Sequence, residues 1–365
     1  MTQKICSFAT IVLIVAVMVV VGYVPMAAAE DSWEKVLAAA KKEGTVSVIG
    51  PATSKLRDTL TLAFEKKYGI KVEYLGERGS GTGPKLAAER GAGKFLWDIV
   101  IGGTTTALKV LNPAGMLDSV EPALILPEVK DPKQWRGGGI EYVDVDKRVL
   151  IMTVSQRSTL FVNPKVVKPD SITSHKDLLH PKFKRKIVLD DPTMAGPGQA
   201  TFTFFYLHPE LGPNFIRELA KQEPTLMRDW NQEVEGIAKE KFLVSVGLFD
   251  IFAEERMKAG VPIALLDPHK IKEGSDAGCV DGALMMVNRA PHPNAAKVYI
   301  NWLLSKEAQT DYARSNGNIS ERLDAPTDHA PWRVPIPKSI KTYTQAAQDV
   351  KGDLMVLLKE AFDRK

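Results

Sequence analysis

The sequence predicts an α/β protein with two units, and three observations support this prediction. Apolar runs of strand length alternate with helix-length segments along most of the chain. Clusters of glycine, serine and threonine follow several of the expected strands. The chain has 365 residues, which is enough for two domains with a sizeable buried core. Each unit is therefore expected to hold a mainly parallel sheet flanked by helices.

Residues 1–29 are expected to be an export signal. Lys4 precedes an apolar run over residues 8–21, and three alanines precede Glu30. This order of charge, apolar run and small residues is typical of a signal peptide with its cleavage site. A membrane anchor is the alternative, although the run is shorter than the ~20 residues that a span requires. The exported protein is therefore expected to begin near Glu30.

The composition argues against several classes of protein. The chain has 48 basic and 44 acidic residues, and this net charge of +4 is too mild to indicate a nucleic-acid partner. Only Cys279 remains after the expected signal, so neither an internal disulfide nor a cysteine-based zinc site is expected. The histidines, among them His175, lack metal-binding spacing and are expected to be loop residues.

The first unit is predicted to begin with three strands separated by helices. In order, the pattern indicates a helix from near Asp31 to Gly44, a strand over 46–49, a helix that ends at Gly69, a strand over 70–75, a short helix through Leu86 and a strand over 97–103. Ligands of parallel α/β sheets bind beyond the carboxyl ends of the strands. The glycine-rich stretch YLGERGSGTGPKL, residues 74–86, is therefore a candidate binding loop.

The middle of the chain is predicted to form a second α/β unit. Residues 147–163 indicate two consecutive strands, and residues 180–202 indicate a turn, a strand and a glycine-broken helix start. Further strands are expected over 242–246 and 283–287, and Asn294 caps a helix after them. Because no low-complexity linker separates the units, we expect extended segments to join them as a hinge.

Six segments together resemble a known family. They are GTVSVIG, FEKKYGIKVEYL, WDIVIGGTTTALKVLNPAGML, TLFVNPKVV, HKDLLHPKFKRKIVLDDP and RAPHPNAAKVYINWLLSKEAQTDYARSNGN. In this order and spacing, the chain resembles the bacterial periplasmic solute-binding proteins of ABC importers, in their ferric-type or family 1 extracellular class. The resemblance covers nearly all of the chain after the expected signal. It implies the two-lobe type II periplasmic-binding fold, also called a Venus flytrap.

The resemblance also implies a domain plan and a cellular role. Residues 30–155 and 285–365 would form the first lobe and residues 156–284 the second, with extended hinge strands between them. The implied protein is periplasmic and monomeric, and it has no cofactor. It would pass a small ligand to an ABC permease in the inner membrane. It would not be an enzyme, because the sequence lacks a G-x-S-x-G elbow or a metal triad.

Residues at the predicted strand ends are candidates for ligand binding. Backbone N–H groups at helix starts favour carboxylates and oxyanions, and arginine adds bidentate recognition of the same groups. For Arg78 a solvated loop charge is the alternative, and the Gly-Pro-Gly of residues 196–198 is alternatively a plain turn. The candidate ligand-binding residues are Thr53, Ser54, Arg78, Ser80, Thr82, Gly103, Thr104, Gln156, Arg157, Thr193, Gly196, Gly198, Gln199, Phe249 and Asp250.

Ferric binding is not expected, because the iron-ligand positions implied by the resemblance are substituted. The ferric members hold iron with a histidine, a carboxylate and a tandem tyrosine pair. Here the corresponding positions are Thr53, Gly103 and Leu248-Phe249, and Asp250 alone is not a site. The expected ligand is instead an organic carboxylate or an oxyanion beside an aromatic wall at Phe249, although Phe249 is alternatively a core residue. A sensory module for a receptor kinase and a ferric binder with altered ligands remain open as alternatives.

Overall fold

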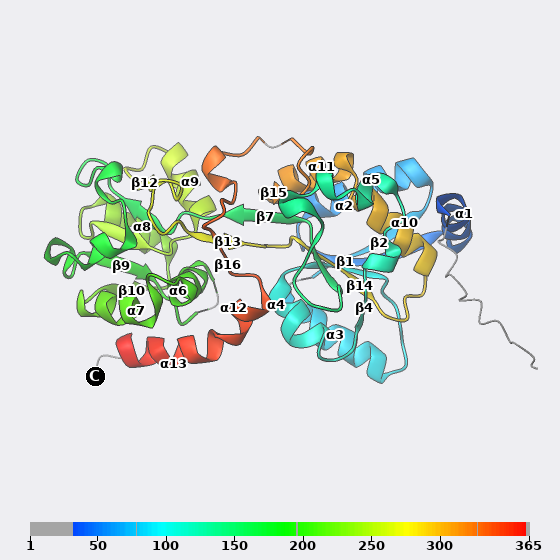
Figure 1. Ribbon diagram of the computed structural model, residues 1–365, viewed down its shortest axis with the longest axis horizontal. Coiled ribbons are helices and arrows are strands. Elements are labelled where there is room, and N and C mark those ends of the chain that lie inside the picture. Colours follow the sequence, from blue (N-terminus) through cyan, green and yellow to red (C-terminus); the bar gives the residue numbers. More distant parts are fainter. Residues whose placement is uncertain (1–31, 78, 195, 327, 363–365) are drawn as a thin grey trace, which may run out of the picture. The chain divides into compact units, whose positions relative to one another are not determined.

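The computed structural model describes residues 32–77, 79–194, 196–326 and 328–362. The expected export signal and the candidate Arg78 lie outside these residues. Within the described ranges, no helix has both the length and the apolar character that crossing a membrane requires. Helices and strands alternate through this part of the chain, as the sequence predicts (Figure 1).

The first sheet has seven strands, and its first part is parallel as predicted. β1 (Thr45–Gly50) lies between β2 (Lys71–Gly76) and β3 (Ile99–Gly102) and runs parallel to both. The remaining strands pair antiparallel to β3 or to one another; they are β4 (Leu117–Asp118), β5 (Glu141–Tyr142), β6 (Val149–Ile151) and β14 (Ala283–Val287). The sheet is therefore mixed, because β14 returns from a distant part of the chain and pairs antiparallel to β3.

The helices of this first part have the ends that capping rules require. α1 (Trp33–Glu43) is capped by Ser32, whose Oγ accepts from the Lys35 N–H at 3.4 Å, and the expected start near Asp31 lies outside the described residues. Gly44 ends α1 at a φ of 73°, in the left-handed region that glycine tolerates. The other helices here are α2 (Ser54–Tyr68), α3 (Gly79–Gly91), α10 (Pro293–Leu303) and α11 (Lys306–Asn316). Their apolar faces form one core with the sheet, in which Phe64, Tyr299 and Trp302 stack.

The second sheet has five strands in the order β10-β9-β11-β8-β12. Its strands are β8 (Leu160–Val162), β9 (Ile187–Asp190), β10 (Thr225–Met227), β11 (Val244–Val246) and β12 (Ala264–Leu265). β9 runs parallel to β10 and β11, whereas β8 runs antiparallel to its neighbours. The helices around it are α6 (Pro197–Leu207), α7 (Gly212–Lys221), α8 (Trp230–Ala238) and α9 (Asp250–Lys258).

A third set of strands runs between the two sheets (Figure 1). It has the order β15-β7-β13-β16, with β7 (Thr153–Gln156) antiparallel to β13 (Asp276–Gly278). β15 (Ile319–Ser320) and β16 (Ile340–Lys341) complete it. The remaining elements are short, except α13: α4 (Thr104–Thr106), a π-helix (Ala107–Leu111), α5 (Pro127–Lys130), α12 (Gln345–Asp349), α13 (Lys351–Phe362) and 3-10 turns such as His175–Leu179 and Pro331–Arg333.

The C-terminal helix packs differently from the predicted domain plan. The sequence analysis assigns residues 285–365 to the first lobe, yet Leu354, Leu357 and Leu358 of α13 belong to the buried core of the second sheet. α13 contacts both α6 and α7. The predicted lobe boundaries stay a prediction, and the packing of α13 favours placing this helix with residues 156–284.

Candidate ligand-binding site

A cavity of about 600 Å³ lies where the crossing strands meet both sheets. Four parts of the chain line it: the loop after β3, the strands β7 and β13, the starts of α6, α8 and α9, and the segment from α11 to α13. The loop after β3 and the start of α6, which follows β9, lie at the carboxyl ends of parallel strands. Ligands of α/β sheets bind at such strand ends. The volume of the cavity is within the range of about 300–1,000 Å³ that is typical of small-molecule sites.

Several of the predicted binding residues lie together in this cavity. They are Gly103, Thr104, Arg157, Gly196, Gln199, Phe249 and Asp250. These residues come from sequence positions as far apart as 103 and 250, so the fold gathers them from both sheets and a crossing segment. Arg78 lies outside the described residues, and nothing of the Ser80 side chain is described.

Other predicted residues have structural partners outside the cavity. Thr53 caps α2, because its Oγ1 accepts from the Leu56 N–H at 3.3 Å, and Ser54 is exposed beside it. Thr193 donates from Oγ1 to Asp191 at 2.6 Å within a turn. Thr53 and Thr193 thus have partners within the protein, and neither they nor the exposed Ser54 line the cavity.

The last three predicted residues are also absent from the cavity lining. The Gly198 N–H donates to Asp190 Oδ2 at 2.7 Å, so this helix-start donor is already used. Gln156 is fully buried, and its Oε1 accepts from the Ile336 N–H at 3.3 Å. Thr82 lines a separate, very small cavity of about 10 Å³ with Gly103.

Arg157 lies in the cavity wall with its charge already balanced. Its Nε lies 2.9 Å from Asp276 Oδ2, and its Nη2 donates to the Pro197 carbonyl at 2.9 Å and to Thr201 Oγ1 at 3.1 Å. Burial opposes the charge, but Asp276 and Asp250 outweigh it and raise the pKa of Arg157 above its ordinary value. The guanidinium is therefore charged at neutral pH, and much of its hydrogen-bonding capacity is used within the protein.

Arg333 is a second cavity arginine, and sequence reasoning missed it. Its side chain is 6% exposed, and its Nη1 and Nη2 lie 3.2 Å from Asp250 Oδ2 and Glu254 Oε1. The guanidinium also lies over the ring of Trp332 at 4.6 Å from its centroid. No local motif marks this residue, because its role follows from a contact with Asp250, far away in the sequence.

Two aromatic rings form one wall of the cavity. The rings of Phe249 and Trp230 lie 5.0 Å apart between centroids at an angle of 43°, and both line the cavity. Trp230 Nε1 donates to Asp190 Oδ1 at 3.1 Å, which fixes the indole. The half-buried Phe249 contributes to this wall, and sequence reasoning missed Trp230.

Lys351 contributes a third cation to the lining, from the first turn of α13. Its Nζ donates to Thr105 Oγ1 at 3.4 Å, and Thr105 Oγ1 in turn donates to Gln348 Oε1 at 3.3 Å. Burial, and then the nearby Lys109, lower the pKa of Lys351. Sequence reasoning missed this lysine as well, because nothing in the C-terminal helix pattern distinguishes it from the surface lysines.

The residues at the positions that hold iron in the ferric members lie in different surroundings in this structure. Gly103 and Phe249 line the cavity, Leu248 is buried, and Thr53 caps a helix. Within the described ranges, no three His, Cys, Asp or Glu side chains are grouped so that they could hold a metal ion. Cys279 lines the cavity as a buried free thiol, and burial raises its pKa.

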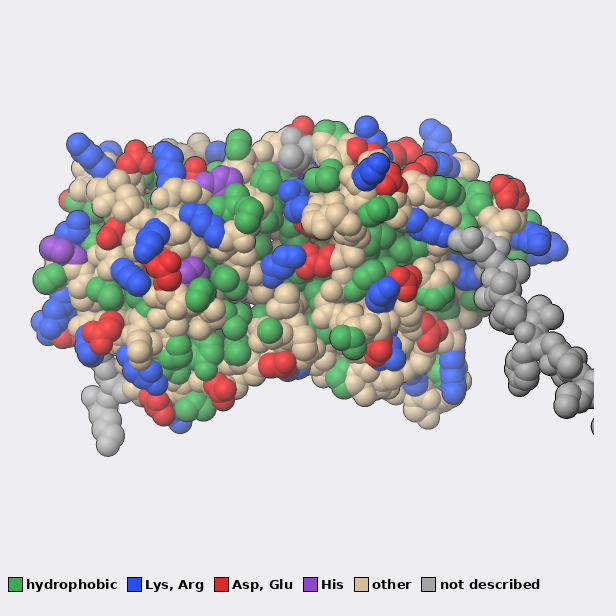
Figure 2. Space-filling view, in the orientation of Figure 1, with side chains coloured by type: hydrophobic (Ala, Val, Ile, Leu, Met, Phe, Trp, Pro, Cys, Tyr) green, Lys and Arg blue, Asp and Glu red, His purple; other side chains and the backbone are tan. Residues whose placement is uncertain are grey.

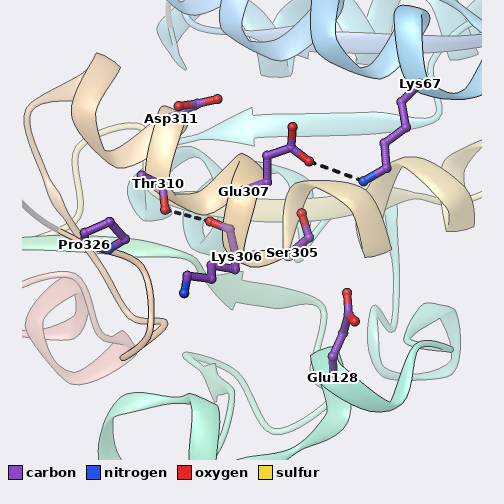
Figure 3. Close-up of a pocket in the computed structure, with 8 residues that line it drawn as sticks. All are labelled: Lys67, Glu128, Ser305, Lys306, Glu307, Thr310, Asp311 and Pro326. Atoms are coloured by element: carbon purple, nitrogen blue, oxygen red, sulfur yellow. Dashed lines mark hydrogen bonds and ion pairs between the residues drawn. The ribbon is translucent and has the colours of Figure 1, made fainter.

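A second pocket of about 510 Å³ lies at the surface over α2, α5 and α11 (Figure 3). Lys67 Nζ and Glu307 Oε2 form an ion pair across it at 3.3 Å, and both side chains are largely exposed. Figure 3 shows lysines and carboxylates together on its wall and no aromatic ring. None of the predicted residues lines this pocket. Exposed ion pairs of this kind contribute little free energy, and this pocket lacks the aromatic wall of the central cavity.

The fold and its central cavity define an α/β binding protein of the two-lobe class. The chain belongs to the bacterial extracellular solute-binding protein family, whose model matches residues 59–348. Solute-binding proteins of this ABC-transporter type bind small ligands and deliver them to membrane permeases, and the family implies a periplasmic location. The resemblance stated from the sequence is thereby confirmed.

The chain is also similar to one further bacterial protein and, in its fold, to solved structures of periplasmic binding proteins. A protein described as uncharacterized from Haemophilus influenzae is 25% identical over 275 residues, which are 74% of this chain and 75% of that protein. Ferric iron-binding protein A of Mannheimia haemolytica, in an open conformation, is 15% identical with a TM-score of 0.68, covering 88% of this chain and 100% of that chain. AfuA of Actinobacillus pleuropneumoniae, with fructose-6-phosphate bound, is 17% identical with a TM-score of 0.59, covering 88% and 99%.

One further similar structure is the Trichodesmium protein IdiA, or FutA, in complex with iron and citrate. It is 16% identical with a TM-score of 0.66, covering 87% of this chain and 99% of that chain. At these identities the structures show a shared fold and nothing about the ligand of this chain.

Proposed function

We propose that this protein captures a small organic anion in the central cavity and delivers it to an ABC permease of the inner membrane. The observation that carries the proposal is the charge of the cavity wall. Three lining residues are cations, Arg157, Arg333 and Lys351, and two are carboxylates, Asp250 and Asp276; Glu254, outside the lining, also pairs with Arg333. A concave, partly desolvated site whose lining holds more cations than carboxylates favours an anionic solute.

The cavity lining also favours an organic ligand over a bare inorganic ion. Phe249 and Trp230 offer an apolar surface, and the side-chain amides of Gln199, Asn316 and Asn318 offer hydrogen bonds. A volume of about 600 Å³ accommodates a molecule with many non-hydrogen atoms. Two of the similar proteins hold organic anions, fructose-6-phosphate in AfuA and citrate together with iron in the Trichodesmium protein.

We further propose that the ligand is enclosed by movement about the crossing strands. β7 and β13 pair through Gln156 and Ala277, and Arg157 and Asp276 of the cavity lie beside this pair. A change in backbone angles at these positions would move the two sheets toward the ligand as hinged bodies. The two bodies in this proposal are residues 32–155 with 283–350, which keeps β14 in the first sheet, and residues 156–282 with α13.

A thermal-shift screen tests the proposed ligand class. Protein recovered from the periplasmic fraction is melted with di- and tricarboxylates, sugar phosphates, phosphonates and aromatic acids, and with neutral sugars and amides of similar size. A ligand at 100 times its Kd stabilises a protein by about 2.7 kcal/mol, which raises Tm by several degrees. We expect anions to raise Tm and their neutral counterparts to do nothing. Stabilisation by neutral solutes alone would refute an anion site.

A further inference from the structure

We infer that Lys351 is the residue that binds the anionic group of the ligand, a carboxylate or a phosphate, and that Arg157 and Arg333 are not. This inference rests on the proposed function, because it names the residue that distinguishes an anion from a neutral solute in the same cavity. Its basis is that Arg157 and Arg333 have carboxylate partners within the protein, whereas Lys351 has none among the described residues.

Both cavity arginines are paired with carboxylates. Arg157 lies 2.9 Å from Asp276, and Arg333 lies 3.2 Å from both Asp250 and Glu254. These partners are largely buried, since the exposed fractions of Asp250 and Asp276 are 3% and 0%. A ligand anion would have to compete with them, and removing either arginine would leave a buried carboxylate uncompensated. The arginines therefore neutralise the protein's own acids.

Lys351 has no carboxylate partner among the described residues. Its Nζ donates to the Thr105 hydroxyl at 3.4 Å, and this contact leaves its positive charge without an ion pair in the described part of the chain. Of the two acids close to this turn, Asp349 is paired with Lys109 at 3.3 Å, and Asp353, in the same first turn of α13, forms no ion pair with Lys351 among the described residues. Since Lys351 lines the cavity, its ammonium is the cavity cation with free capacity for an anion.

The position of Lys351 is unfavourable for the free protein. The residue lies in the first turn of α13, where the helix dipole disfavours a cation, and Lys109 adds a second positive charge nearby. Burial without an acidic partner adds to this cost, and the lowered pKa of Lys351 has the same origin. A cation held in an unfavourable environment at a cavity wall is expected to gain an anionic partner when a ligand binds.

The groups beside Lys351 can complete an anion site. Thr104, Thr105 and Gln348 all line the cavity and offer a hydroxyl or an amide. Gln199, on the facing α6, also lines it and contacts α13, where its Nε2 lies 3.7 Å from Met355 Sδ. An ammonium with surrounding hydroxyl and amide donors suits a carboxylate or phosphate oxygen, whereas it offers no coordination to a metal cation.

The experiment compares wild type, Lys351→Gln and the matched control Lys359→Gln. Lys359 lies on the same helix and is exposed, so its variant removes the same charge away from the cavity. Tm is measured for each protein in increasing inorganic phosphate and sulfate, with chloride at matched ionic strength as the reference. We expect both divalent anions to raise Tm over chloride in wild type and Lys359→Gln, and this difference to be lost in Lys351→Gln.

The organic anions of the screen give the second readout. Each one that stabilises wild type should bind Lys351→Gln roughly 10- to 100-fold more weakly, the factor that a hydrogen bond to a charged group contributes. If the phosphate and sulfate response is the same in wild type and Lys351→Gln, or absent from both, Lys351 is not the anion contact. If organic anions still stabilise both proteins equally, the anion cavity stands without Lys351. Binding of neutral solutes alone would remove both proposals.

Discussion

Two buried polar groups in this protein differ in how completely they are satisfied. The first, here called the His175 cluster, consists of Thr159, Ser174, His175 and Glu273. Thr159 Oγ1 lies 2.8 Å from His175 Nε2, Ser174 Oγ lies 2.5 Å from Glu273 Oε1, and the His175 N–H donates to Glu273 Oε2 at 2.9 Å. The named polar atoms all have a partner inside the protein.

The second group, in the cavity wall, leaves some capacity unused. Asp276 is fully buried and binds Arg157 through Oδ2, while its Oδ1 has no hydrogen-bond partner in the described part of the chain. Lys351 has no carboxylate partner there either. Burying an unpaired polar group costs free energy, so each one calls for an explanation, and a bound ligand is one such explanation for a group beside a cavity. From this difference we expect the His175 cluster to stabilise the fold and the cavity group to act in binding.

The largest expected effect is on stability, from Glu273→Ala. The side chain is 2% exposed and accepts from Ser174, from the His175 N–H and from the His175 ring at 3.3 Å. Its removal leaves these buried donors unpaired, so the free energy of unfolding should fall by about 3–5 kcal/mol in urea titrations. Glu210→Ala, which breaks only an exposed pair with Lys272, is the control and should change little.

Glu273→Ala also tests, through its ligand affinity, whether the His175 cluster and the cavity group act separately. At a temperature where Glu273→Ala remains folded, its affinity for an anion from the screen should match that of wild type. A large loss of affinity with intact folding would mean that the His175 cluster acts on the ligand site, and the division between the two groups would fail.

The next effect is a loss of stability in acid that depends on His175. Burial lowers the pKa of this histidine below its ordinary value, although Glu273, Asp276 and Asp177 oppose the shift. The unfolded chain then binds a proton that the folded protein does not, so stability is present above about pH 6.5 and is lost as the pH falls below it. The loss should approach about 1.4 kcal/mol per pH unit.

Unfolding of wild type and His175→Gln between pH 7.5 and 5 checks this sign. Glutamine does not titrate, so its curve should be flatter in this range, and the difference between the two slopes isolates His175 from other acid-sensitive groups. Glu273 acts in the same direction at lower pH, because its hydrogen bonds hold its pKa below the ordinary value. Parallel curves would show that His175 binds a proton as readily in the folded protein as in the unfolded chain, which contradicts the lowered pKa.

The framework of the fold was predictable because local patterns determine it. Gly44 and Gly69 stop α1 and α2 with positive φ values, and the alternation of strands and helices gives the parallel arrangement of β1, β2 and β3. The antiparallel pairing of β14 with β3 was not predictable from local patterns. It joins residues 99–102 to residues 283–286, which are far apart in the sequence. His175 was expected in a loop and is instead fully buried in a 3-10 turn.

The candidate site was predictable only where its residues lie at strand ends or helix starts. Gly103, Gly196 and Phe249 lie at such places and line the cavity. Arg333 and Lys351 come from the C-terminal segment, where no glycine cluster or strand end marks a ligand. Arg333 has acidic partners and Lys351 has none among the described residues, and only the tertiary structure shows this difference. Thr53 has the expected residue type but caps a helix.

The smallest expected change in stability comes from Phe249→Ala, because this residue lies in the cavity wall and not in the His175 cluster. Phe249 is half-buried and stacks on Trp230, so its loss should lower the free energy of unfolding by about 0.5–1.5 kcal/mol for the aromatic pair, plus a modest term for lost burial. Its effect on binding should be larger than this stability change suggests, because Phe249 lines the cavity and its ring would contact a solute held there. Calorimetric titration with the best anion of the screen measures the affinity, and Phe362→Ala, on the far end of α13, serves as an aromatic control outside the cavity. Unchanged affinity in Phe249→Ala would show that the aromatic wall packs against the protein alone, and the unsatisfied polar groups would then carry the binding without it.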